Sequence, residues 1–382
     1  MRALPLLALL PFAAAANLHA ARSSTTACNN SPALCSKSYG EITHLGAHDS
    51  PFVHSSATGN SLAGDQYYDT TTQLDSGVRL VTAQVHKSNG EWRLCHSLCE
   101  LMDAGLLSTW LGKIKTWLDA NPNDVVTVLL VNSDGATASE LHAQFKTADI
   151  TDYAYEPKSS SSAPSSWPTL QEMINDGKRL VTFVASIDAS EEAPYLMDEW
   201  TYLWENPYDV SSPTNFSCVP NRPPAVAGDT STALSSDRLP LMNHFLYSEG
   251  LSFIGVEYPN ASYVSTTNAP SGGVGNLGSA ATKCKSAWGG RQPTFILVDF
   301  FNKGPAIDTV DSLNNVTNAV GRSSISASNS THSSAGSTTG NVFTSLVHLA
   351  KTARSGATPS IGNWVWVGGN WGNLLGGGIS FS

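Results

Sequence analysis

Short apolar runs separated by turn-forming residues recur along most of this chain. Six of them have the length of a β-strand, and they lie at residues 42–45, 78–85, 125–131, 179–185, 239–246 and 295–300. A run that is apolar throughout, rather than at alternate positions, is typical of a parallel strand covered on both faces. The pattern therefore predicts a buried, mostly parallel sheet.

Between the second and third runs the apolar residues change to helical spacing. They are Leu107, Trp110, Leu111, Ile114, Trp117 and Leu118. Residues 121–123, Asn-Pro-Asn, end this helix before the next strand begins. Continued alternation of strand and helix predicts an α/β fold: a single TIM-type (β/α) barrel, with catalytic loops at the carboxyl ends of its strands. The periodicity alone is equally compatible with an open parallel sheet.

The two ends of the chain differ from its middle. Residues 1–20 combine one arginine, a short apolar stretch and small residues, which is typical of a secretory signal peptide. Residues 21–320 are predicted to form the barrel. Residues 321–382 are rich in Ser, Thr and Gly, and we expect a low-complexity tail with an apolar C-terminal segment. That segment is broken by Asn and Gly and matches a glycolipid-anchor signal poorly. We expect a secreted protein, extracellular or associated with the cell wall.

Six cysteines suit an exported protein, because an oxidising compartment allows them to pair. Our hypothesis is that neighbours along the chain pair: Cys28 with Cys35, Cys95 with Cys99, and Cys218 with Cys284. Zinc at Cys95 and Cys99 is discounted, since no second ligand pair follows at zinc-site spacing. Glycosylation sequons fit the same export route, and they begin at Asn29, Asn215, Asn260, Asn315 and Asn329.

The net charge of −10 and the absence of a Lys/Arg cluster argue against nucleic acid as a partner. Neutralising a phosphate backbone requires concentrated positive charge. We expect no cofactor, and we expect a monomer.

Three motifs carry a specific resemblance. They are Ala-His-Asp-Ser at residues 47–50, Leu-Asp-Ser-Gly-Val-Arg-Leu at 74–80 and Leu-Cys-His at 94–96. In order and spacing they resemble the X-domain of phosphatidylinositol-specific phospholipases C, within the PLC-like phosphodiesterase superfamily. Residues 117–126 and 297–300 look like a helix and further strands of that domain. The chain looks closest to fungal secreted members.

The resemblance implies that two histidines cleave a phosphodiester. By position His48 matches the general base and His96 the general acid, and an imidazole pKa near 6.5 suits both tasks. Asp299 matches the carboxylate that orients the base, and Asp49 could hold the second imidazole. Each of these residues also has a purely structural explanation, so the hypothesis depends on the four of them occurring together.

The chain departs from the family pattern on its second strand. Thr82 and Gln84 share one strand face, where bacterial relatives place an Asp and a phosphate-binding Arg. Calcium-dependent relatives carry carboxylate ligands on the same strand, which a hard cation requires. We therefore expect no metal, and a metal-independent mechanism with a weakened phosphate clamp.

Another cation could replace the missing arginine. Arg79 is the nearest, although strand alternation turns it away from the face of Thr82 and Gln84. Lys283, Arg291 and Lys303 have no positional support.

Aromatic and polar residues that follow other predicted strands could also line a pocket. With Arg79, Thr82 and Gln84, the candidate substrate-binding residues are therefore Trp204, Glu205 and His244. Core packing explains Trp204 and His244 equally well.

The function expected first is a secreted phosphoric diester hydrolase, phospholipase C-like, acting on a phospholipid headgroup or a related phosphodiester. Transient contact with a membrane surface is compatible with it. The alternative is a catalytically impaired barrel that binds a lipid headgroup or a glycan, as the missing charges at Thr82 and Gln84 suggest. A glycoside hydrolase would need paired carboxylates at strand ends; Glu205 and Glu257 could take that role, but nothing else in the sequence supports it.

Overall fold

The computed structural model describes residues 27–248 and 258–325. Its strands are β1 (His44–Ala47), β2 (Leu80–Ser88), β3 (Glu91–Cys95), β4 (Asp103–Leu106), β5 (Val126–Asn132), β6 (Leu180–Ala185), β7 (Leu196–Asp198), β8 (Leu203–Glu205), β9 (Leu239–Asn243) and β10 (Phe295–Val298). Its α-helices are α1 (Thr70–Asp75), α2 (Leu107–Ala120), α3 (Ala138–Thr147), α4 (Leu170–Asn175), α5 (Glu199–Tyr202), α6 (Thr230–Ser235), α7 (Val264–Thr267), α8 (Leu277–Ala287) and α9 (Ala306–Asn314). Single 3-10 turns lie at Pro32–Leu34, Ser56–Thr58, Thr151–Tyr153 and Pro224–Val226.

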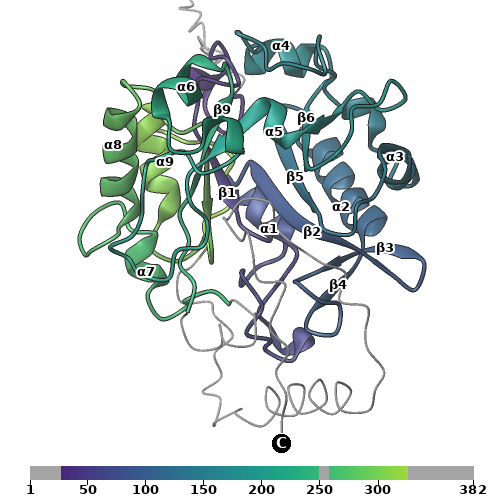
Figure 1. Ribbon diagram of the computed structural model, residues 1–382, viewed down its shortest axis with the longest axis horizontal. Helices are drawn as coiled ribbons and strands as arrows, with labels where there is room; N and C mark the ends of the chain where they lie inside the picture. Colours follow the sequence, from purple (N-terminus) through teal and green to yellow (C-terminus); the bar gives the residue numbers. More distant parts are fainter. Residues whose placement is uncertain (1–26, 249–257, 326–382) are drawn as a thin grey trace, which may run out of the picture.

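All ten strands belong to one sheet. Eight are parallel and run in the order β7-β6-β5-β2-β1-β10-β9-β8, while β3 and β4 extend β2 as an antiparallel hairpin. Apart from that hairpin, the spatial order follows the order along the chain, as in a (β/α) barrel. Figure 1 shows α2 and α3 on one side of the strands and α8 and α9 on the other. The predicted α/β barrel is confirmed.

The barrel is interrupted between its two end strands. Within the described residues β7 pairs with β6 and β8 pairs with β9, and no pairing joins β7 to β8. Only the four-residue helix α5 connects them. Parallel neighbours need a crossover of a dozen residues or more, so a single helical turn cannot lay these two strands side by side.

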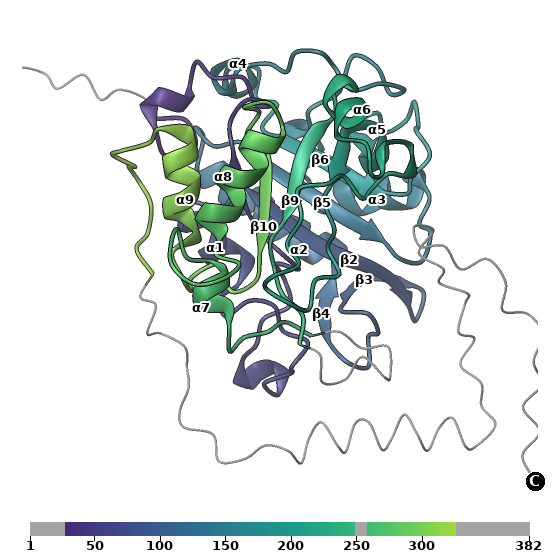
Figure 2. The ribbon, with the colours of Figure 1, turned by 60° about the vertical axis from the view of Figure 1, so that its left-hand side comes forward.

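Alternation along the strands creates two apolar cores. On β2 the side chain of Leu80 points into the barrel, where it meets Leu129, Leu297 and other interior residues. Val81 points outward into the layer between sheet and helices, which includes Trp110 of α2. Figure 2 shows α8 and α9 covering the outer face beside β10.

The six predicted strands are all present, with bounds that differ by at most three residues. The predicted helix is α2, and its six apolar residues are all buried. The three-residue strands β7 and β8 and the β3–β4 hairpin were not predicted. The three disulfides join Cys28–Cys35, Cys95–Cys99 and Cys218–Cys284, as predicted.

The predicted signal peptide, at residues 1–20, lies outside the described residues, as does most of the predicted tail. After α9 the described chain stays in contact with the barrel, because the Ser323 amide donates to the Asp75 carbonyl at 2.8 Å. None of the helices in the described part of the chain is long and apolar enough to cross a membrane.

Candidate active site

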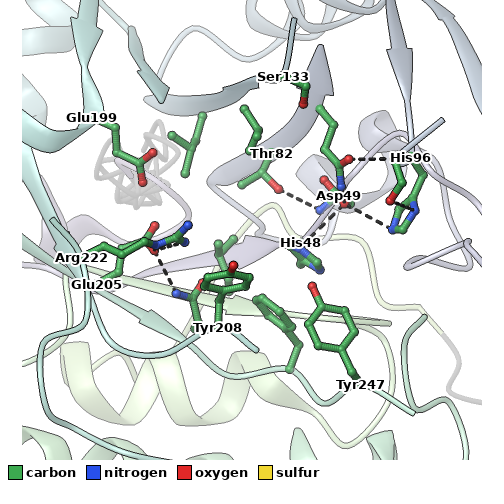
Figure 3. Close-up of a pocket in the computed structure, with 17 residues that line it drawn as sticks. His48, Asp49, Thr82, His96, Ser133, Glu199, Glu205, Tyr208, Arg222 and Tyr247 are labelled. Atoms are coloured by element: carbon green, nitrogen blue, oxygen red, sulfur yellow. Dashed lines mark hydrogen bonds and ion pairs between the residues drawn. The ribbon is translucent and has the colours of Figure 1, made fainter. Parts of the chain in front are cut away.

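A cavity of about 290 Å³ opens at the carboxyl ends of the parallel strands. Its lining includes residues from β2, β5, β8, β9 and β10, from the loops that follow β1 and β3, and from α5. Figure 3 shows two polar groups within it. His48, Asp49 and His96 lie toward one side, and Glu199, Glu205 and Arg222 lie toward the other.

His48 directly follows β1 and is held by two contacts. Its Nδ1 donates a hydrogen bond to Asp299 Oδ1 at 2.9 Å, from the residue that directly follows β10. Its ring stacks on Phe245, with centroids 3.9 Å apart and 4° between the planes. Asp299 therefore orients the imidazole and leaves Nε2 as the nitrogen that can exchange a proton.

His96 directly follows β3, in the turn closed by the Cys95–Cys99 disulfide. Its Nε2 lies 3.7 Å from Asp49 Oδ2 and 3.4 Å from Asp65 Oδ2. The edge of the ring faces Phe52, with centroids 5.4 Å apart. Two carboxylates thus lie close to this imidazole, although both distances exceed that of a good hydrogen bond.

Asp49 lies between the two histidines, with Oδ2 3.8 Å from His48 Nε2. Gln84 Nε2 donates to Asp49 Oδ2 at 2.6 Å, and the Asp49 amide donates to Thr82 Oγ1 at 2.8 Å. Thr82 and Gln84 both line the cavity. Their hydrogen bonds fix Asp49, so the departure from the family pattern on β2 has a positioning role here.

Asp65, in the loop between β1 and α1, was not predicted as a site residue. The residue is fully buried, and neither of its carboxyl oxygens has a hydrogen-bond partner among the described residues. Besides His96, it approaches His48, with 3.8 Å between Oδ1 and Nδ1. A single aspartate in a polar loop gives no periodic signal that would distinguish it from a solvated residue.

Burial lowers the pKa of both imidazoles, and nearby carboxylates decide the net direction. For His48 the carboxylates of Asp49 and Asp299 outweigh burial, and the pKa lies above its ordinary value. For His96 burial dominates, and the pKa lies below its ordinary value. Burial, together with the nearby Asp299 and Asp49, holds the pKa of Asp65 well above its usual range.

The second polar group centres on Glu205, at the end of β8. Its Oε2 accepts hydrogen bonds from Arg222 Nε at 2.9 Å, from Arg222 Nη2, and from Asn243 Nδ2 at 3.2 Å. The Arg222 guanidinium lies 4.2 Å from the ring centroid of Tyr208. Burial and the nearby Glu205 hold the pKa of Glu199 well above its usual range. Arg222 is the only Lys or Arg among the described residues that line the cavity.

Three of the expected substrate-binding residues lie outside the cavity lining. Arg79 lies at the opposite end of β2, where its Nη2 donates to Asp124 Oδ1 at 2.7 Å. Trp204 faces away from Glu205 and packs against Trp288. His244 is buried, and its Nε2 donates to the carbonyl of Thr267 at 3.1 Å. These positions argue against the substrate-binding role expected of all three.

Two overlapping groups of side chains among the described residues could hold a metal ion. One consists of His48, Asp65 and Asp299, and the other of Asp49, Asp65 and His96. Neither uses Thr82 or Gln84, whose uncharged side chains are a poor match to a calcium ion that needs anionic oxygens. The expectation of no metal considered the second strand and the cysteines on either side of His96, so it did not take these groups into account.

Comparison with known proteins places the fold and the motifs in one family. A family model described as PI-PLC X 1 matches residues 34–314. A PI-PLC X domain-containing protein 1 of Arthroderma benhamiae is 36% identical over 75% of this chain and 89% of its own length. An uncharacterized secreted protein of the same organism is 40% identical over 77% of this chain. The matched region covers 65% of that relative's own length.

Among solved structures, a phosphatidylinositol-specific phospholipase C from Listeria monocytogenes is similar with a TM-score of 0.49. It is 13% identical, over 73% of this chain and 95% of its own. The extent of the family match and the identity to the fungal relative decide the classification. This chain belongs to the PI-PLC X-domain family.

Proposed function

We propose that this protein is a secreted phosphoric diester hydrolase that uses His48 and His96 as a proton-transfer pair. The observation that carries the proposal is that two histidines, each beside its own aspartate, converge on one cavity. Membership of the PI-PLC X-domain family supports a phosphodiesterase-type reaction. A relative named as a secreted protein supports export.

In the proposed reaction His48 Nε2 takes the proton of the attacking hydroxyl, while that oxygen forms a new bond to phosphorus. The bond from phosphorus to the leaving oxygen breaks, and His96 gives that oxygen a proton. Asp299 stabilises the imidazolium that forms at His48. No step requires a metal ion.

The pKa directions have a consequence for the pH profile. A base must be neutral and an acid protonated, whereas the free site favours protonated His48 and neutral His96. The reacting form is then the less populated of the two forms that carry one proton. Both forms hold the same number of protons, so a bell-shaped profile of kcat/KM is still expected.

The Glu205 group suggests what the substrate carries on one side of its phosphate. A protonated Glu199 can donate a hydrogen bond, Glu205 can accept one, and Arg222 can donate. Such a set suits the hydroxyls of a polyol better than an apolar group. We therefore favour a phospholipid headgroup, or a soluble diester, with a hydroxyl-rich part.

A second candidate function is a binding protein of reduced activity. Glu205 accepts hydrogen bonds from Arg222 and offsets its charge, so the clamp on a phosphate is weaker than an arginine free of a carboxylate would give. The proposed binding ligands are the same headgroups, or a glycan. Turnover decides between the two candidates.

The test is turnover of phosphodiesters that differ in their leaving group. With an alkoxide leaving group, His48→Ala and His96→Ala should each lower kcat by roughly 10² to 10⁴-fold. The double variant should be little worse than either single variant, because residues that act as a unit are not additive. With an aryl leaving group, which departs without a proton, His96→Ala should lose far less activity than His48→Ala.

His142→Ala is the matched control, since His142 lies outside the cavity lining and its Nδ1 hydrogen-bonds Tyr195 Oη at 2.9 Å. This variant should keep wild-type kcat, and circular dichroism should show that all variants are folded. Undiminished turnover by His48→Ala would sink the mechanism. A wild-type protein that binds headgroups but cleaves no diester would favour the second candidate function.

A further inference from the structure

The buried carboxyl group of Asp65 has an environment that proton transfer by the two histidines does not explain. Within the described part of the chain both oxygens lack a hydrogen-bond donor, and the side chain has no exposed surface. A buried, ionised carboxylate without a partner is costly, so the group must either hold a proton or face a cation. Among the described residues, no Lys or Arg forms an ion pair with it.

We propose that Asp49, Asp65 and His96 form a binding site for one transition-metal ion, Zn²⁺ being the best match. The three ligand atoms all lie within 4.8 Å of one another. His96 Nε2 is 3.4 Å from Asp65 Oδ2 and 3.7 Å from Asp49 Oδ2. Nitrogen and oxygen ligands of a tetrahedral zinc ion are separated by about 3.4 Å, since each lies near 2.1 Å from the metal.

The alternative group, His48 with Asp65 and Asp299, is a poorer site. His48 Nδ1 is already committed to a hydrogen bond with Asp299 at 2.9 Å. His96 Nε2, in contrast, faces two carboxylates at distances too long for good hydrogen bonds and close to those that a shared ion would give.

Donor chemistry and charge select the kind of ion. One imidazole nitrogen with two carboxylate oxygens suits zinc and its first-row neighbours, whereas calcium requires six to eight oxygens. Two carboxylates and a neutral imidazole balance a divalent charge. Asp49 is also held in place by Gln84, whose Oε1 accepts from the Ser97 amide at 2.9 Å. Such support beside a ligand is typical of metal sites.

The open coordination position would face the cavity, because Asp49 and His96 both line it. An imidazole bound to a metal is not an imidazolium and cannot protonate a leaving oxygen. Occupation of the site therefore removes His96 from catalysis, so zinc inhibits the enzyme and a chelator leaves activity intact or raises it. This inhibitory part rests on the proposed function, but the binding part does not.

The test uses the full secreted chain, stripped with a chelator and dialysed. Titration calorimetry with ZnCl₂ should give one ion per chain, and Co²⁺ should give the visible absorption of a site with few nitrogen and oxygen ligands. Asp65→Asn keeps the shape of the side chain and should weaken zinc binding by at least about 100-fold, more than the loss of a supporting residue. Asp49→Asn is a second variant in case the first does not fold.

Asp134→Asn is the matched control. Asp134 Oδ1 lies 3.3 Å from His86 Nδ1, a His–Asp pair without a third potential ligand in the described part of the chain, so zinc binding should be unchanged. Wild-type protein that binds no zinc, or that binds it equally after Asp65→Asn, overturns the site and leaves Asp65 as a protonated acid. Zinc that binds as expected but raises turnover overturns the inhibitory role. Failure of every diester as a substrate would refute the proposed function. The calorimetry would still show whether Asp49, Asp65 and His96 bind zinc.

Discussion

At the scale of single residues, each histidine depends on a carboxylate from another part of the chain. His48 and Asp299 are 251 positions apart, yet both directly follow neighbouring strands, β1 and β10. Parallel strands present their carboxyl ends at the same edge, which brings such residues together. The aspartate determines the tautomer of the imidazole as well as its position.

This dependence predicts the effect of Asp299→Asn. The substitution should lower kcat by up to about 10⁴-fold, as loss of the orienting carboxylate does in a serine protease triad. It also removes a negative charge that raises the pKa of His48, so the limb of the kcat/KM profile that reports His48 should move to lower pH. Steady-state kinetics across pH measure both effects.

Asp308→Asn, in α9, is the control and should leave profile and kcat unchanged, because Asp308 is not among the cavity residues. A fall in kcat without any movement of the profile would mean that Asp299 only maintains the local structure.

At the scale of elements, the turn after β3 matters most for the site. The His96 amide donates to the Met102 carbonyl at 3.0 Å, and the Cys95–Cys99 disulfide closes the turn around the histidine. Ser97 adopts a φ of 58°, in a region that non-glycine residues rarely occupy. The covalent link keeps this turn in one conformation.

Replacing both Cys95 and Cys99 by Ser should therefore impair function more than folding. Closing so short a loop stabilises the protein by about 2 kcal/mol, which denaturant unfolding should detect. Displacement of His96 by an ångström should cost up to about 100-fold in kcat. Mass mapping of the wild-type protein should find no free thiol at either position.

The double substitution of Cys28 and Cys35 by Ser is the control. That disulfide closes a loop of similar length, and neither cysteine lines the cavity, so stability should fall by a similar amount while kcat is retained. Equal loss of kcat in both double variants would show that the effect of Cys95 and Cys99 is one of global stability.

At the scale of the whole molecule, buried neutral histidines link folding to pH. Burial lowers the pKa of His44 and of His244 to about 4. In the unfolded chain the value is near 6.5, so the unfolded state binds more protons between pH 4 and 6.5. The contribution of each histidine to stability is fully present above pH 6.5 and is lost as the pH falls toward 4.

Replacing one buried histidine by a residue that does not titrate isolates its effect on the pH dependence of stability. The buried carboxyls change stability with pH in the opposite direction. His244→Gln should destabilise the protein by about 2 kcal/mol less at pH 5 than at pH 7, because the wild type has by then lost that contribution. Urea unfolding at both pH values measures the difference. His44→Gln should behave alike, and an equal destabilisation at both pH values would contradict the assignment.

Burial also determines which of the sequons are accessible for glycosylation. Asn29 is buried, and its Oδ1 accepts a hydrogen bond from the Val125 amide at 2.7 Å, so it is not accessible for glycosylation in the folded protein. Asn215 and Asn315 are exposed. Export and glycosylation remain predictions that intact-mass analysis of the secreted protein can check.

Much of this protein could be predicted from local patterns. Strands buried on both faces give continuous apolar runs, and α2 gives a helical stripe, so the α/β class and six of the eight parallel strands were evident. His48, Asp49 and His96 lie in short motifs that resemble those of the family, and they were found by that resemblance. Strands of three residues, such as β7 and β8, are too short to produce a pattern, and their pairing depends on neighbours far along the chain.

Only the tertiary structure decided which side chains share the cavity. Arg79 was the nearest cation predicted from the sequence and Arg222 was not considered, but Arg79 lies at the amino end of β2 with Asp124, and Arg222 lines the cavity beside Glu205. Asp65 carries no signal until folding places it between two histidines and removes it from water. Local sequence determines backbone preference and burial, whereas charge, pKa and ligand geometry depend on contacts between residues that only the folded chain brings together.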